Sequence, residues 1–294
     1  MTATDTTPVS GPRTITDREF ALMQALIYRE AGIHLSSAKK ALLVGRLSKR
    51  LRELGIDRFN TYYERVVEDK SGVELVILLD AITTNETSFF REPRQFQFLE
   101  QHVFPTWEAD ALEGRRSRRL RVWSAACSTG EEPYSIAMSL LDRFPPDGGW
   151  QVDVLATDIS TRVLERAVDG VWPIARAATV PEHLLKRFML RGTGSQQGKM
   201  KAGADVRAPL TFQRLNLNDE SYPVAGPFDA IFCRNVLIYF DQDSRTRVIR
   251  RLIDLLAPGG YFFLGHAESL TGMTDRVRSV APAVYTNTPA PRGR

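Results

Sequence analysis

From Leu120 onward, short apolar runs alternate with amphipathic runs, and this alternation restricts the possible folds more than any other feature of the sequence. The apolar runs predict β-strands over 120–126, 151–157, 210–215, 228–233 and 260–265. The amphipathic runs predict helices over 131–143, 160–168 and 243–256. Strands that alternate with helices predict an α/β fold with a doubly wound, mostly parallel sheet.

Each conspicuous polar cluster in this region follows one of the predicted strands. The clusters are Ser124 to Glu131, Asp158, Asn216, Arg234 with Asn235, and His266 to Glu268. In an open parallel sheet, ligands bind outside the carboxyl ends of the strands, where the strand order reverses. The shared position of these clusters therefore predicts one ligand site at that edge of the sheet.

The segment from Arg121 to Met138 is predicted to form a strand, a tight turn and a helix, and its turn indicates the kind of ligand. The turn contains the small residues Ala125, Ala126, Ser128 and Gly130, which would let a flat ligand approach the backbone closely. Glu131 and Glu132 open the helix, where they complement its dipole but would repel a phosphate. The turn therefore favours a ligand with hydroxyl groups or positive charge, such as a sulphonium nucleoside.

Two cofactors commonly occupy such a site. A dinucleotide-binding turn would carry Gly-x-Gly-x-x-Gly, whereas this turn has the single glycine Gly130, so NAD is disfavoured. A class I methyltransferase instead needs an acid at the end of the second strand to accept hydrogen bonds from both ribose hydroxyls of S-adenosylmethionine. Asp158 has that position, but it could equally cap the helix that begins near Ser160. Spacing alone leaves both roles open.

The first part of the chain has a different pattern. Residues 15 to about 82 have helical periodicity, with apolar faces such as Leu43, Leu47 and Leu51. We expect a small all-α domain of four helices over 14–84, followed by linker helices over 85–119 that contribute to the active site. Thr83 to Glu86 offers a capping box, which predicts a short helix through Phe89 and Phe90. A further helix is expected after Pro93.

The α/β domain is expected over 120–287, with an interruption. The region 171–209 breaks the alternation and predicts an inserted small antiparallel β-subdomain with a helix around Pro181–Met189. Residues 276–287 alternate in polarity and predict an antiparallel edge hairpin. The segments 1–13 and 288–294 are expected to be flexible tails.

Composition excludes several classes of protein. A content of 43% hydrophobic and 25% charged residues is ordinary for a soluble globular chain. No apolar run approaches the ~20 residues of a membrane span, and the first residues lack the pattern of a secretory signal. The two cysteines, Cys127 and Cys233, favour a reducing cytoplasm without a disulfide framework or a zinc site. We therefore expect a cytoplasmic protein.

The net charge is only +4, but its distribution is uneven. The stretch from Lys39 to Arg52 contains six cations and no acid, which predicts an acidic partner surface. Arg46, Lys49 and Arg50 have the i, i+3, i+4 spacing of one basic helix face. We expect this face to dock the substrate, although an ordinary solvated helix face has the same pattern.

Four strings of residues carry a resemblance to a known family. They are Thr84-Asn-Glu-Thr-Ser-Phe-Phe-Arg-Glu92, Ser128-Thr-Gly-Glu-Glu-Pro-Tyr-Ser135, Phe228-Asp-Ala-Ile-Phe-Cys-Arg-Asn-Val-Leu-Ile-Tyr-Phe-Asp241 and Gly265-His-Ala-Glu268. In this order and spacing the chain closely resembles the chemotaxis receptor glutamate methyltransferases, the CheR family. The resemblance extends from about residue 15 to 287.

The resemblance implies that a methyl group passes from S-adenosylmethionine to glutamate side chains of bacterial chemoreceptors, leaving S-adenosylhomocysteine and setting sensory adaptation. The family's cofactor contacts correspond to Asn85, Thr87, Arg91, Glu131, Asp158, Asn216, Leu217, Arg234 and Asn235. Arg91 and Tyr239 match the positions beside the transferring methyl group and are the expected catalytic residues. His266 and Glu268 match a family motif and are expected to be structural.

The resemblance also implies partners. The cytoplasmic helical domain of chemoreceptors would be the substrate, and the protein would be recruited to membrane receptor arrays without entering the membrane. Gly192, Gly194 and Gly198 resemble the loop by which some relatives hold a receptor's C-terminal peptide as an added strand, although a plain glycine-rich turn looks similar. A monomer without bound metal is expected.

The chemistry requires little from the protein beyond orientation. A glutamate carboxylate with a pKa of about 4.3 is ionised at pH 7, so no general base is needed.

Two alternative functions are left open. A nucleic-acid methyltransferase would need aromatic residues among the cations, and residues 39–52 contain none. A catalytically inactive signalling scaffold is the other, and the joint presence of Arg91, Asp158, Asn235 and Tyr239 argues against it.

Overall fold

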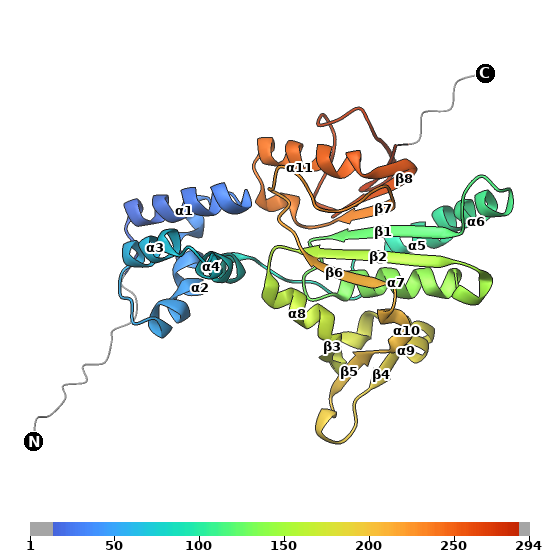
Figure 1. Ribbon diagram of the computed structural model, residues 1–294, viewed down its shortest axis with the longest axis horizontal. Coiled ribbons are helices and arrows are strands. Elements are labelled where there is room, and N and C mark those ends of the chain that lie inside the picture. The colour runs from blue at the N-terminus through green and yellow to red at the C-terminus, as the bar shows by residue number, and fades with distance from the viewer. Residues whose placement is uncertain (1–13, 288–294) are drawn as a thin grey trace, which may run out of the picture. The chain divides into compact units, whose positions relative to one another are not determined.

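The computed structural model describes residues 14–287, and residue contacts divide the chain into two compact units (Figure 1). The first unit, called the helical unit here, comprises the residues up to Thr84 together with Tyr239–Asp241. The second, the sheet unit, comprises Asn85–Ile238 and the residues from Gln242 onward. The two expected tails, 1–13 and 288–294, lie outside the described residues.

The helical unit contains four α-helices, as the sequence predicts. They are α1 Asp17–Ala31, α2 Lys40–Glu53, α3 Phe59–Glu68 and α4 Val73–Ile82. Thr16 begins α1 with a complete capping box, in which its hydroxyl accepts from the Glu19 N–H. The apolar face of α2, made of Leu43, Leu47 and Leu51, is buried. Each helix therefore forms because its apolar stripe has a partner within the unit.

The sheet unit is built on a seven-stranded sheet of order β6-β2-β1-β7-β8-β10-β9. The strands are β1 Arg119–Ala125, β2 Gln151–Asp158, β6 Leu210–Arg214, β7 Phe228–Cys233, β8 Leu256–Leu264, β9 Arg278–Ala281 and β10 Val284–Thr286. The first five are parallel, and β10 pairs antiparallel with both β8 and β9. The fold-class prediction is confirmed. Because β1 lies between β2 and β7, the strand order reverses there, and a ligand site is expected at the carboxyl ends of these strands.

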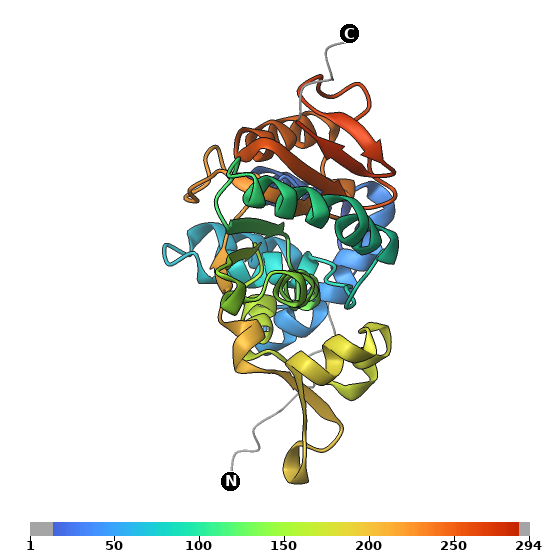
Figure 2. The same cartoon turned by 90° about the vertical axis from the view of Figure 1, so that its right-hand side faces the viewer.

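Helices cover this sheet. They are α5 Pro93–Phe98, the π-helix η2 Leu99–Val103, α6 Phe104–Leu112, α7 Glu131–Arg143, α8 Thr161–Asp169 and α11 Gln242–Asp254. The aromatic residues of α6 pack tightly, with Phe104 lying 5.1 Å from Phe144 between ring centroids. Figure 2 shows the β9–β10 hairpin at one end of the sheet and the inserted subdomain beyond the other.

The interruption over 171–209 is an inserted subdomain with its own three-stranded antiparallel sheet of order β3-β5-β4. Its elements are β3 Val171–Pro173, η4 Ile174–Thr179, α9 Glu182–Phe188, β4 Met189–Arg191, η5 Gly194–Gln196, β5 Lys199–Ala202 and α10 Ala204–Arg207. Both the antiparallel sheet and the helix near Pro181 were expected, and α9 begins one residue after that proline.

The predicted short helix through Phe89 and Phe90 is wrong. Residues 83–88 have no regular secondary structure, and Phe90 has a positive φ of 50°. The Thr84 hydroxyl accepts a hydrogen bond from Arg46 at 2.9 Å, while the Phe90 N–H donates to the Ser135 hydroxyl at 2.9 Å. Both phenyl rings are buried. Burying the two aromatic rings stabilises the non-helical conformation, and this gain exceeds what a capping box contributes to the start of a helix.

Three further features bear on the sequence predictions. No helix between residues 14 and 287 is long and apolar enough to cross a membrane. Cys127 and Cys233 are both buried free thiols, and burial raises the pKa of each well above its ordinary value. Within the same residues no group of three or more His, Cys, Asp and Glu side chains could hold a metal ion.

Candidate functional site

The turn after β1 is held in an unusual backbone conformation at the predicted site. Ala126, Ser128 and Gly130 all have positive φ, of 68°, 51° and 96°. At Gly130 an added Cβ would lie 2.9 Å from the Cβ of Ala167, so only glycine fits. The Cys127 N–H donates to the Thr157 carbonyl of β2 at 2.8 Å. Strained, firmly bonded backbone of this kind is typical of ligand-binding turns.

Asp158 links this turn to the loop after β2. One oxygen of its buried carboxylate accepts from the Ser128 N–H at 2.9 Å, and the other accepts from the Ser160 N–H at 3.0 Å. Ser160, not Asp158, is the N-cap of α8, because its hydroxyl accepts from the Val163 N–H. The structure therefore excludes Asp158 as the N-cap of α8, and its role toward a ribose stays a prediction.

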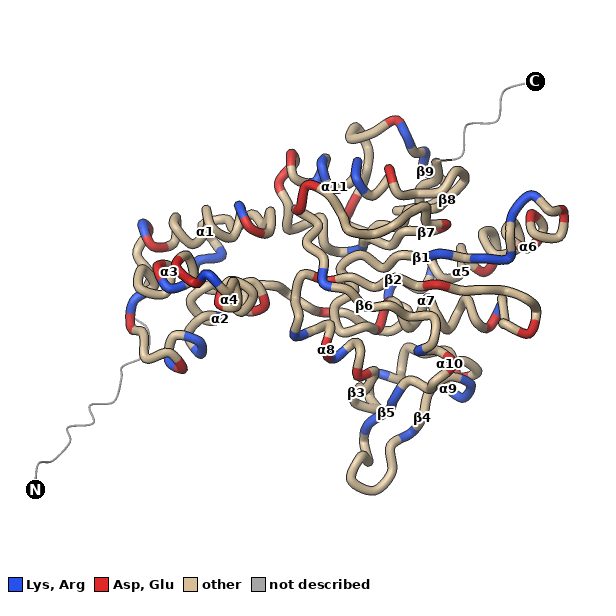
Figure 3. The backbone as a smooth tube through the Cα atoms, viewed as in Figure 1, with Lys and Arg blue, Asp and Glu red and all other residues tan. Residues whose placement is uncertain are grey.

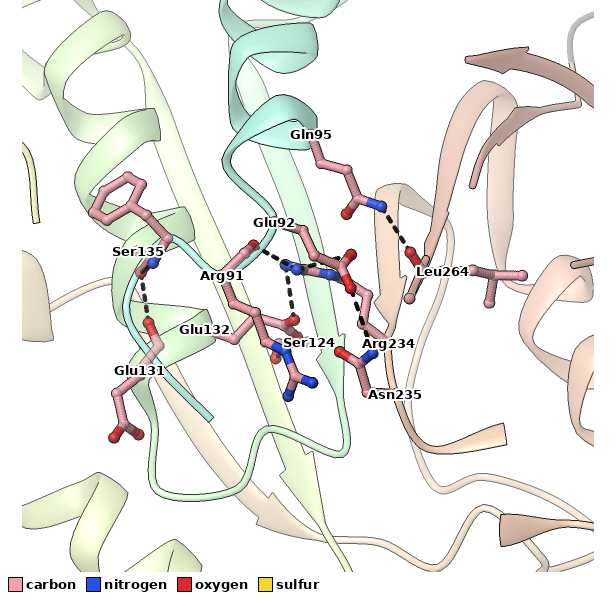
Figure 4. Close-up of polar contacts among 12 residues, drawn as sticks. Arg91, Glu92, Gln95, Ser124, Glu131, Glu132, Ser135, Arg234, Asn235 and Leu264 are labelled. Carbon is pink, nitrogen blue, oxygen red and sulfur yellow. Dashed lines mark hydrogen bonds and ion pairs between the residues drawn. The ribbon is translucent and has the colours of Figure 1, made fainter. Parts of the chain in front are cut away.

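The two glutamates that open α7 point in different directions (Figure 4). Glu131 is buried and accepts from the Thr129 hydroxyl at 2.6 Å. Glu132 accepts from the Ser124 hydroxyl at 2.7 Å and lies 3.3 Å from the Arg234 guanidinium. Burial raises the pKa of the Glu132 carboxyl, and Arg234 offsets only part of that effect.

Arg234, just beyond β7, is the centre of a buried ionic cluster. Its side chain is 1% exposed and lies between Glu132 and Glu92, whose carboxylate is 3.1 Å away (Figure 4). The guanidinium also donates to the Arg91 carbonyl. Its Nε has no hydrogen-bond partner among residues 14–287. A buried donor without a partner is costly, so this atom marks the place where a polar ligand is expected.

Glu92 and Glu268 fix the backbone around this cluster. Glu92 has a positive φ of 60° and accepts from the His266 N–H at 3.1 Å and from the Asn235 amide at 3.4 Å. Glu268 accepts from the N–H groups of Asn235 and Gly265 at 2.8 and 2.7 Å. Asn235 itself has a φ of 57°. These contacts agree with the structural role expected for Glu268.

The other predicted cofactor residues lie on segments joined to these. The Asn85 carbonyl accepts from the Ser128 hydroxyl at 3.0 Å, which ties the segment 85–92 to the turn. Arg91 donates to the Glu86 carbonyl at 3.0 Å and forms no ion pair in the described part of the chain. Beyond β6, the Leu215 N–H donates to the Asp158 carbonyl at 3.0 Å and so anchors the segment that continues into Asn216 and Leu217.

The charged side chains of the site suit a cationic nucleoside. Four carboxylates lie on these segments, and those of Glu92 and Glu132 contact the buried cation Arg234. The other two belong to Glu131 and Asp158. Such a site disfavours a pyrophosphate and complements a positive charge. Together with the sheet order, it defines the class of the protein as a nucleoside-binding α/β methyltransferase.

Comparisons with known proteins make this class specific. The family description "CheR methyltransferase, SAM binding domain" matches residues 85–286, and "CheR methyltransferase, all-alpha domain" matches residues 18–83. The chain belongs to the CheR methyltransferase family. Its S-adenosylmethionine-binding domain is therefore the sheet unit that carries the site.

Curated relatives agree over nearly the whole chain. "Chemotaxis protein methyltransferase 2" of Pseudomonas aeruginosa is 41% identical over 274 residues, covering 92% of this chain and 93% of the relative. The "Chemotaxis protein methyltransferase" of Salmonella typhimurium is 39% identical, covering 92% and 90%. That of Escherichia coli is 39% identical, covering 92% and 91%.

The predicted docking residues do not form one free basic face. Arg46 donates to the carbonyls of Ile82 and Thr83. Arg50 forms two hydrogen bonds to the buried carboxylate of Glu74, one of them 2.8 Å long. Lys49, in contrast, has a side chain that is 83% exposed. Figure 3 shows acidic residues interspersed with the basic ones along the helical unit.

Two further predicted sets belong to other elements of the chain. Tyr239 ends the short helix η6 Leu237–Tyr239, and its carbonyl accepts from the His34 N–H at 2.8 Å within the helical unit. Gly192, Gly194 and Gly198 belong to the β4–β5 hairpin, where Gly194 and Gly198 have φ of 55° and 83°. A Cβ at Gly192 would lie 2.0 Å from the Gln196 carbonyl, so this glycine is required by the turn itself.

Sequence reasoning missed Glu92 as a site residue and interpreted Glu132 as helix-start electrostatics. Both are ion partners of Arg234. The only signal in the sequence was that Glu92 directly follows Arg91 in the first family string.

Proposed function

We propose that the protein transfers a methyl group from S-adenosylmethionine to glutamate side chains of bacterial chemoreceptors. Membership of the CheR family across both units carries this proposal. The buried, predominantly acidic site around Arg234 supports it, since it complements a cationic nucleoside.

The cofactor supplies an electrophilic methyl group bound to a positively charged sulphur. Asp158 would hold the ribose hydroxyls, and Arg234 with Asn235 would hold the methionine end. The nucleophile would be an ionised glutamate of the substrate, so the protein has no proton to remove. Its contribution is orientation, which can lower a barrier by up to ~7–11 kcal/mol when alignment is ideal.

Arg91 would orient the incoming carboxylate. Its guanidinium is partly exposed and bonded to one backbone carbonyl, so it retains donors for a substrate. Charge disappears as the methyl group transfers, so a very tight ion pair with the substrate would slow the reaction. Tyr239 would place its hydroxyl beside the methyl group.

The chemoreceptor would be bound in two ways. Lys49, supported by the partly exposed Arg46 and Arg50, would attract the acidic helices of the receptor's cytoplasmic domain. The hairpin of Gly192, Gly194 and Gly198 would hold a receptor's C-terminal peptide by adding a strand to β4, which lies at an edge of its sheet. The protein would then act in the cytoplasm, as a monomer at receptor arrays.

A labelling experiment tests the proposal. The purified protein is incubated with methyl-labelled S-adenosylmethionine and membranes that contain chemoreceptors, beside total RNA as a competing substrate. Label on the receptor that is released by mild base supports a glutamate ester. Label on RNA would support a nucleic-acid methyltransferase, and cofactor binding without any labelling would support an inactive scaffold.

A further inference from the structure

Trp172, in the inserted subdomain, is bonded to the turn that carries the cofactor residues. Its indole N–H donates to the Thr129 carbonyl at 3.1 Å. Its buried ring packs edge-on against Tyr134 of α7 and Phe89, each at 5.0 Å between centroids. One side chain of β3 therefore contacts the turn before α7, the first part of α7 and the segment 85–92.

Arg176, four residues later, makes a second connection. Its guanidinium donates to the Thr87 carbonyl at 2.8 Å. It lies on η4, whose first N–H, that of Ile174, donates to the Gly198 carbonyl of the β4–β5 hairpin at 2.8 Å. The peptide of Thr87 is thus fixed by a side chain that is itself anchored on the subdomain's sheet.

The subdomain has contacts of its own in addition to these two hydrogen bonds. Its strands are paired with one another, β3 with β5 and β5 with β4. Leu184, Phe188 and Met200 are buried in the same apolar core as Phe89 and Tyr134. Other contacts attach it to the sheet unit at a distance from the site, for example Arg187 with Asp142 of α7 at 2.7 Å. The hydrogen bonds to the carbonyls of Thr129 and Thr87 add to these contacts, and they hold two segments of the site.

We propose that Trp172 and Arg176 are positioning residues of the cofactor site, so that the inserted subdomain completes this site in addition to any role in receptor binding. Trp172 fixes the carbonyl of Thr129, which directly precedes Gly130 and lies two residues before Glu131. Arg176 fixes the carbonyl of Thr87. This proposal rests on the proposed function in one respect, since it takes the segments around Thr129 and Thr87 as parts of the cofactor site.

The test uses cofactor binding to the full chain without any receptor. Arg176→Ala removes one charge-assisted hydrogen bond, and we expect the Kd for S-adenosylhomocysteine, measured by calorimetry, to rise about fivefold. Arg187→Ala is the matched control, because it removes an exposed arginine of the same subdomain that is bonded to α7 away from the site. Its Kd should equal that of the unmodified protein.

Trp172→Phe is the second variant, since it keeps an aromatic ring and removes the indole N–H. We expect a similar rise in Kd, with circular dichroism showing that the fold is kept. Equal Kd values for Arg176→Ala, Arg187→Ala and the unmodified protein would overturn the proposal, even if Trp172→Phe failed to fold. A protein that binds S-adenosylhomocysteine but methylates no receptor would refute the proposed function and leave this test intact.

Discussion

Reversing the charge of Arg50 tests whether this side chain stabilises the helical unit or only binds the receptor. Arg50 lies against the carboxylate of Glu74, whose side chain is 5% exposed, while the arginine is 24% exposed. Arg50→Glu would place a second carboxylate beside this buried one. Removing one partner of a buried ion pair costs about 3–5 kcal/mol, and a repelling charge adds to that cost.

The expected effect on stability is large. For a unit of this size each kcal/mol lowers Tm by about 4–8 °C, so the helical signal should melt at least about 12 °C lower. The assay is thermal unfolding followed by far-ultraviolet circular dichroism. The double variant Arg50→Glu with Glu74→Arg restores opposite charges and should recover part of the loss.

Lys49→Glu is the control that probes docking alone. Its side chain is 83% exposed and lies 3.8 Å from Glu53, so the unfolding free energy should change by less than about 0.5 kcal/mol. Receptor binding should weaken, most strongly at low salt, and cofactor affinity should stay unchanged. Equal Tm values for Arg50→Glu and Lys49→Glu would refute the structural role argued for Arg50.

Three further predictions concern the site. Arg91→Ala should reduce turnover far more than cofactor affinity, and an equal loss of both in steady-state kinetics and calorimetry would contradict the orienting role. Gly130→Ala should destabilise the protein by about 1–3 kcal/mol, because alanine at a φ of 96° is strained and its Cβ would meet Ala167; denaturant titration measures this. Burial raises the pKa of Glu132 in the folded state, so its protonated form contributes stability to the fold. This contribution is complete below the unfolded pKa of about 4.5 and is lost as the pH rises through the folded pKa. The Tm of Glu132→Gln relative to the unmodified protein should therefore increase with pH, and a constant difference would show that the carboxyl does not titrate as argued.

Much of the fold and of the site could be predicted because the information is local or follows from sheet topology. The strands around Trp123 and Ile231 are short, mostly apolar runs, and parallel strands bring their carboxyl ends to one edge. Asp158 and Arg234 could therefore be placed together without knowing any contact between them. The predicted helix α7 has the bounds found in the structure, since Gly130 and the glutamates mark its start.

The failures have a different cause. Phe89 and Phe90 follow a local capping signal, but the Phe89 ring packs against Trp172 and the Phe90 N–H donates to the Ser135 hydroxyl, both far along the chain. The lack of acids from Lys39 to Arg52 suggested a free basic face, yet Arg50 forms two hydrogen bonds to Glu74, 24 residues away on another helix. Local patterns report neither kind of contact, because both depend on tertiary packing.

The order of the strands has a consequence for synthesis of the chain. β1 gains its neighbour β2 early, but its other neighbour, β7, follows it by about a hundred residues, or roughly 5–20 s at the usual rate of translation. During that time the β1 edge lacks its second neighbour, and the ring of Phe96 lacks Phe232 of β7, on which it stacks in the folded protein. Gln95 lacks its hydrogen-bond acceptor for still longer, because its side-chain amide donates to the carbonyl of Leu264, 169 residues further along the chain. A nascent chain stalled before β7 would expose an unpaired strand edge, which is the kind of surface that chaperones bind and that aggregates form from.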